Sequence, residues 1–202
     1  MRLSVALATV LFASLFAGSA CNKSSDSASK DKDEKSESAS KKGKKKKANP
    51  TAEFEGDEGG AKKLLTKLME EEDSRLELTQ ALLPQDDDYE AVFKEDAVED
   101  ARKGYKKLFE KFSDAKIEPK KGQTELKLFS ATADDLKDGS GDAKNFPGGY
   151  KKVAPKMKKD VTVYAWKFVQ PGESSGMAYD GLVHVNGHWA WFPKPWRALG
   201  DE

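Results

Sequence analysis

Apolar positions in the first half of the chain recur with the spacing of an α-helix. Residues 64–69 form one apolar face, and residues 76–83 continue it after a charged interruption. This pattern predicts two short helices or one bent helix, ended by Pro84. The acids at 86–88 stand where a helix cap and its first turn belong, and are expected to be solvated. The clearest apolar stripe, over 97–112, predicts a further helix.

Beyond Phe112 the apolar period changes from that of a helix to that of a strand. A polar, glycine-rich stretch over 133–149 separates the first predicted strand from the others, and a short helix is predicted at 150–157. Asn186-Gly187 is a strong hairpin-turn signal. The predicted strands cover 124–132, 161–169, 177–185 and 188–192. The expected fold class is α+β, with N-terminal helices packed on a C-terminal antiparallel sheet.

This order of elements is similar to that of the nuclear transport factor 2-like superfamily, in which helices pack on a curved sheet in a cone. The similarity covers about 140 residues and includes no diagnostic motif. A cystatin-like layout is the competing interpretation. The superfamily contains enzymes, ligand binders and interaction modules, so the resemblance implies a fold and leaves the function open.

Composition limits the chemistry available to the chain. It has 202 residues, 35 basic and 35 acidic side chains, and a formal net charge of zero. A single cysteine excludes an intrachain disulfide framework and a cysteine-rich zinc site, and two histidines leave little for a histidine-based metal site. Nucleotide-binding and hydrolase motifs are absent from the sequence. We therefore expect no metal and no cofactor.

The N-terminus has the features of an export signal. Residues 1–20 contain an early arginine, an apolar run and then small residues, and the run is too short to span a membrane. Cys21 follows directly, which resembles the lipobox of bacterial lipoproteins, although Gly18 stands where that family usually has leucine. The resemblance implies acylation of Cys21 and anchoring in the cell envelope, with Asn22 favouring the outer membrane. A secreted protein with an unmodified thiol is the alternative.

Charge divides the remaining chain into a basic tether and an acidic domain. Residues 21–50 are rich in lysine and serine, carry a net charge of +5, and are expected to be disordered. They could act as a spacer, or contact anionic lipid or cell wall through Lys41, Lys42, Lys44, Lys45, Lys46 and Lys47. Residues 51–202 carry a net charge of −6 and are expected to form a single domain. Nucleic acid is not an expected partner of an exported chain with an acidic domain.

The candidate site follows from strict alternation along the predicted C-terminal hairpin. One sheet face would carry Asp180, Leu182, His184, Trp189 and Trp191, and the other Tyr179, Val183, Val185, His188, Ala190 and Phe192. If the first face is exposed, its two tryptophans form an aromatic platform with polar neighbours, suited to sugars, aromatic ligands or peptides. If it is core, the tryptophans serve packing. In a cone-shaped fold, the core face would also line a pocket.

Three functions fit these features. The first is a lipid-anchored envelope protein whose domain binds a ligand or a protein partner, with no catalysis evident. The second is a small hydrolase or isomerase in which Asp180 orients His184 as a general base. The third is a structural protein that contacts the cell wall through its lysine run. The two histidines should point to opposite faces, which argues against a shared metal.

Overall fold

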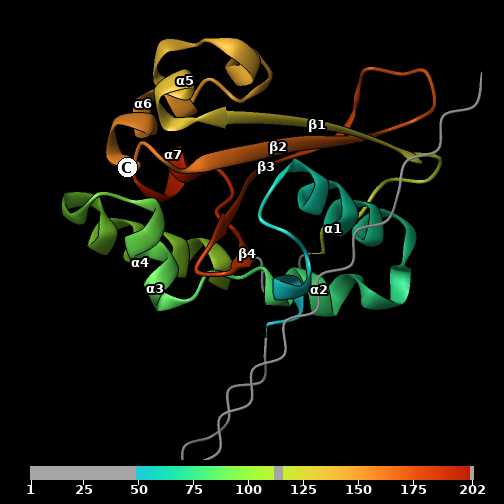
Figure 1. The fold of residues 1–202 in the computed structure, drawn as a ribbon, viewed down its shortest axis with the longest axis horizontal. Helices are drawn as coiled ribbons and strands as arrows, with labels where there is room; N and C mark the ends of the chain where they lie inside the picture. The colour runs from blue at the N-terminus through green and yellow to red at the C-terminus, as the bar shows by residue number, and fades with distance from the viewer. Residues whose placement is uncertain (1–48, 112–115, 201–202) are drawn as a thin grey trace, which may run out of the picture. The chain divides into compact units, whose positions relative to one another are not determined.

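A computed structural model describes residues 49–111 and 116–200 (Figure 1). The predicted signal peptide, Cys21 and the lysines of the tether lie outside these residues. The α-helices are α1 (Glu58–Glu70), α2 (Arg75–Ala81), α3 (Asp86–Val92), α4 (Glu95–Glu110), α5 (Ala133–Asp138), α6 (Tyr150–Val153) and α7 (Pro195–Ala198). Short 3-10 helices occur at Pro50–Glu53, Glu72–Ser74, Gly141–Asn145 and Ala154–Lys156. The strands are β1 (Glu125–Thr132), β2 (Thr162–Val169), β3 (Gly176–Val185) and β4 (His188–Trp191).

The strands form one antiparallel sheet in the order β1-β2-β3-β4, so the predicted α+β class is confirmed. The strand predictions agree with the structure to within one residue at each end. Asn186 and Gly187 make the β3–β4 turn with positive φ angles of 51° and 77°, as an Asn-Gly hairpin requires. Helix α5 was missed because the sequence after β1 is polar, and Thr132 with Asp135 forms a capping box that begins this helix.

Helices cover both faces of the sheet. In Figure 1, α1 and α2 lie to one side of β4, α3 and α4 lie to the other, and α5 lies next to β1. One core cluster joins α1 and α2 to one face through Leu64, Leu65, Leu68, Leu78, Leu82, Tyr164, Trp166, Phe168, Leu182 and Trp189. The other joins helices α3–α7 to the opposite face, with Phe93, Tyr105, Tyr150, Val163, Ala165, Val183, Ala190 and Phe192 among its members. Both faces are therefore core.

A β-bulge in β3 changes which face its first residues occupy. On β2, the adjacent Tyr164 and Ala165 pair with Leu182 and Asp180, so that Gly181 is the extra residue. Gly181 has a φ of 91°, and its carbonyl oxygen accepts a 2.7 Å hydrogen bond from the Phe192 amide. Because paired residues share a face, Asp180 lies on the Ala165 side, and Leu182 lies on the Tyr164 side.

Replacing Gly181 by alanine is expected to destabilise the fold severely. A Cβ at this position would overlap the Phe192 carbonyl oxygen and would also sit on a left-handed backbone. We expect a loss of about 3 kcal/mol in the free energy of unfolding, measured by urea denaturation.

Gly187→Ala is the matched control, because Gly187 also has a positive φ but has open space where its Cβ would lie. Its expected cost is about 1 kcal/mol, from the backbone alone. Equal losses in the two variants would mean that the close approach at the bulge does not constrain the fold.

Candidate functional site

The bulge separates residues that strict alternation along β3 would place together. Asp180 was predicted to share a face with His184 and Trp189, on the assumption of unbroken alternation. His184 pairs with Trp189 on the α1–α2 face, whereas Asp180 lies on the opposite face, where it bonds to Tyr150. Tyr179 moves the other way and packs on the α1–α2 cluster. The predicted face assignment of Asp180 and Tyr179 is therefore wrong, and the structure does not bring Asp180 and His184 together as a catalytic pair.

Trp189 is a packing residue in this structure. Its side chain is fully buried, with ring centroids 5.5 Å from Tyr164 and 5.1 Å from His184. Its backbone exchanges two 3.1 Å hydrogen bonds with the Thr51 hydroxyl, which donates to the Trp189 carbonyl and accepts from its amide. The exposed platform that the sequence suggested for Trp189 is absent, because α1, α2 and the segment before them cover this face.

His184 lies in a separate, polar cavity of about 390 Å³. Gly56 packs directly on the imidazole, leaving no room for a larger residue at that position. Burial, with a smaller contribution from the charge of His188, lowers the pKa of His184. Lys158 and Asp160 line the same cavity, and no hydrogen bond joins either side chain to His184 among the described residues.

Asp180 is only 7% exposed and lines two further cavities, one of about 270 Å³ beside Ala165 and Phe146 and a more apolar one of about 210 Å³. Its Oδ1 accepts 2.9 Å hydrogen bonds from the Tyr150 hydroxyl and the Lys194 amide. Its backbone carbonyl accepts another, also 2.9 Å, from the Trp191 indole. Within residues 49–111 and 116–200, Oδ2 receives no hydrogen bond and no ion pair within 4.0 Å.

The wall of the 210 Å³ cavity is mostly apolar and comes from four parts of the fold. Helices α2 and α4, strand β3 and the segment from β4 to α7 contribute. Leu83, 41% exposed, is one of two large exposed apolar side chains in the described part of the chain. The described lining residues are Thr79, Gln80, Leu83, Leu108, Phe109, Ala178, Tyr179, Asp180, Trp191, Pro193 and Lys194. We call this the Asp180 cavity.

The turn after β4 is held in an unusual conformation beside the Asp180 cavity. Lys194 has a φ of 49°, in the left-handed region that few residues other than glycine adopt. The hydrogen bond from its amide to Asp180 Oδ1 holds this conformation, while Pro193 and Pro195 restrict the backbone on either side. A strained residue that contacts a cavity is a common feature of ligand sites.

Burial sets the protonation behaviour around Asp180. Desolvation raises the pKa of Asp180, and the hydrogen bonds from Lys194 and Tyr150 oppose this rise. Burial and the nearby Asp180 charge raise the pKa of Tyr150 well above its ordinary value, so its phenol stays protonated and donates. The same two causes raise the pKa of Tyr105, whose buried hydroxyl has no hydrogen-bond partner among the described residues.

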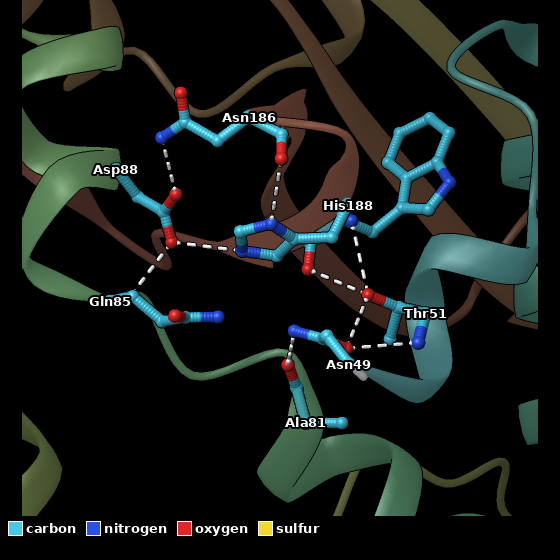
Figure 2. Close-up of polar contacts among 8 residues, drawn as sticks. Asn49, Thr51, Ala81, Gln85, Asp88, Asn186 and His188 are labelled. Carbon is cyan, nitrogen blue, oxygen red and sulfur yellow. Dashed lines mark hydrogen bonds and ion pairs between the residues drawn. The ribbon is translucent and has the colours of Figure 1, made fainter. Parts of the chain in front are cut away.

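A second buried acid, Asp88, has a different environment (Figure 2). Its Oδ2 accepts from the Gln85 amide at 2.7 Å and lies 3.0 Å from His188 Nε2, and its Oδ1 accepts from Asn186 Nδ2 at 2.8 Å. Asp88 is fully buried, so the expectation that it is a solvated cap acid is wrong, although its place in the first turn of a helix is confirmed. These contacts tie the β3–β4 turn to α3. The acid run before the apolar stripe indicates the helix start, but no local pattern indicates the contacts of Asp88 with Asn186 and His188.

Within the described ranges, no three His, Cys, Asp or Glu side chains converge as a metal site. None of the helices that the structure describes is long and apolar enough to cross a membrane. Comparison of the chain with protein-family models, curated proteins and solved structures found no match. The resemblances to lipoproteins and to the nuclear transport factor 2-like superfamily therefore stay predictions.

The raised pKa of Asp180 predicts how its replacement changes stability with pH. A carboxyl whose pKa is higher in the folded state than its ordinary value of 3.8 binds protons more tightly when folded. Burial makes the ionised carboxylate of Asp180 less favourable in the folded state. The wild type therefore loses stability as the pH rises through the raised pKa. Asp180→Asn keeps an acceptor at Oδ1 and removes this titration. Urea denaturation should show the variant gaining stability relative to wild type between about pH 3 and pH 7.

Asp135→Asn is a control of opposite sign. Hydrogen bonds from Thr132 and Ser140 lower the pKa of Asp135, so this carboxylate stabilises the fold above its ordinary pKa and loses that effect as the pH falls. Relative to wild type, Asp135→Asn should lose stability over the same rise in pH. A loss of stability in Asp180→Asn over this rise in pH, like that expected for Asp135→Asn, would contradict the burial of Asp180.

Proposed function

We propose that this protein is an exported, lipid-anchored envelope protein whose α+β domain binds a small ligand in the Asp180 cavity. The observation that carries the proposal is a largely apolar cavity with one buried carboxylate, of which one oxygen has no partner among the described residues. Ligand sites commonly combine an apolar wall with a few placed polar groups. The export signal and the position of Cys21 support the anchoring.

A binding role is favoured over catalysis by the distribution of titratable groups. The proposed acid–base pair, Asp180 and His184, lies on opposite faces of the sheet. Next to the Asp180 cavity, the phenol of Tyr150 already donates to Asp180 and has a strongly raised pKa, which suits it to hold the carboxylate and not to exchange protons near neutral pH. A hydrolase or isomerase is the weaker proposal for this reason.

The anchoring is tested by Cys21→Ser in the native host. We expect the wild-type chain in the membrane fraction and the variant in the soluble exported fraction, because acylation of Cys21 is the proposed attachment. The readouts are fractionation and mass spectrometry of the N-terminal peptide. Ser19→Thr is a control that alters the same region and leaves the cysteine. Recovery of both variants with the membrane would refute the anchor.

The binding site is tested by replacing Leu83 at the cavity wall. The probe is 2-phenylethanol, a small molecule with an aromatic ring. Leu83→Gln removes apolar contact with the probe, so we expect its affinity to fall about fivefold, which corresponds to about 1 kcal/mol of lost burial. Titration of the Trp191 indole proton by NMR measures the affinity. Leu76→Gln is the matched control, since Leu76 is 40% exposed and lies outside the cavity lining. Equal affinities in the two variants would contradict the site.

A further inference from the structure

The free oxygen of Asp180 restricts what the cavity can hold. Asp180 is buried, and both hydrogen bonds to its carboxylate go to Oδ1. Oδ2 is not among the fully buried atoms that lack a partner, so it can be reached from outside the side chains that pack on Asp180. A cation or a hydrogen-bond donor that reaches it would stabilise the ionised carboxylate. An occupant of the cavity that supplies such a group gains more here than it would on an open surface.

The lysine at the cavity does not already fill this role. Lys194 bonds to Asp180 through its backbone amide, and no ion pair forms between its ammonium and Asp180 within 4.0 Å among the described residues. Its side chain is exposed, and its charge acts on Asp180 without a direct contact, where it lowers the pKa of the carboxyl. Asp180 Oδ2 therefore has no direct partner in the described part of the chain.

The apolar wall of the cavity also suits a cation. The rings of Tyr179 and Trp191 meet edge to face with centroids 6.3 Å apart, and both line the cavity together with Phe109. Aromatic faces attract a cation near them, and a desolvated setting strengthens that attraction. The Trp191 indole N–H is occupied by the Asp180 carbonyl, so this ring offers the ligand no free donor.

The volume limits the ligand to a small molecule. An apolar cavity of about 150 Å³ holds one benzene. The Asp180 cavity, of about 210 Å³, thus has room for one ring and a short chain, on the order of nine heavy atoms.

We propose that the Asp180 cavity binds a small primary amine with an apolar, preferably aromatic, body, and that the ammonium donates to Asp180 Oδ2. This inference rests on the proposed function, because it names the ligand class of the same cavity. The amine reaches the carboxylate while its body contacts Leu83, Phe109 and Trp191. An anionic ligand of the same shape would meet the Asp180 charge and bind poorly.

The test uses three probes that share a phenyl ring and a short chain and differ in their end group. They are 2-phenylethylamine, 2-phenylethanol and phenylacetate, which are close in size, and they are titrated against the purified chain near neutral pH by calorimetry and by NMR of the Trp191 indole. We expect the amine to bind at least about tenfold more tightly than the carboxylate, with the alcohol between them. In Asp180→Asn, the amine should lose about tenfold in affinity and the alcohol should change little.

The outcomes separate the ligand class from the site. If the alcohol or the carboxylate binds wild type as tightly as the amine, or if Asp180→Asn keeps the preference for the amine, the proposed ligand class is overturned and the cavity remains a binding site. If none of the three probes binds wild type, the inference and the proposed function both fail. The wild-type comparison decides the ligand class even if the variant does not fold. Circular dichroism of Asp180→Asn checks its fold.

Discussion

The extra residue at Gly181 is the constraint on which the rest of the site depends. A strand of regular alternation would send Asp180 to the α1–α2 face, beside Leu182 and Trp189. The bulge turns Asp180 to the other face, where Tyr150 and the Lys194 amide meet its carboxylate. The same bulge presents the Gly181 carbonyl to Phe192, so β3, β4 and the turn before α7 are joined at one point. Only glycine combines this backbone with the close approach of Phe192.

The buried acids Asp88 and Asp180 differ in how many of their carboxylate oxygens have hydrogen-bond partners. This difference indicates a structural role for Asp88 and a candidate binding role for Asp180. Asp88 has contacts to both oxygens, from Gln85, Asn186 and His188, and it is fully buried. Such a group stabilises the turn that it holds and offers nothing to a ligand. Asp180 has its contacts on one oxygen and a cavity beside it. Its second oxygen can still accept a hydrogen bond from a group that is not among the described side chains.

Much of the fold could be predicted from the sequence because its signals are local. The Asn186-Gly187 turn, the β-branched and aromatic strands and the helix stripe over 97–112 each depend on neighbours in the chain. The site could not be predicted in the same way. Gly181 inside a strand was a signal for a bulge, but its effect on Asp180 depends on the register with β2. The burial of Asp88 depends on His188, 100 residues later, and no local pattern reports that contact.

The arrangement around Asp180 favours holding a ligand over transforming one. Catalysis by an acid–base pair needs two groups that exchange protons near the working pH. Here burial and the Asp180 charge raise the pKa of both nearby phenols, Tyr150 and Tyr105, so that neither loses its proton readily. His184, whose pKa is lowered, lies across the sheet in a different cavity. The bulge thus separates Asp180 from His184. Asp180 remains at the cavity as a fixed hydrogen-bond acceptor, which suits the recognition of a ligand that donates.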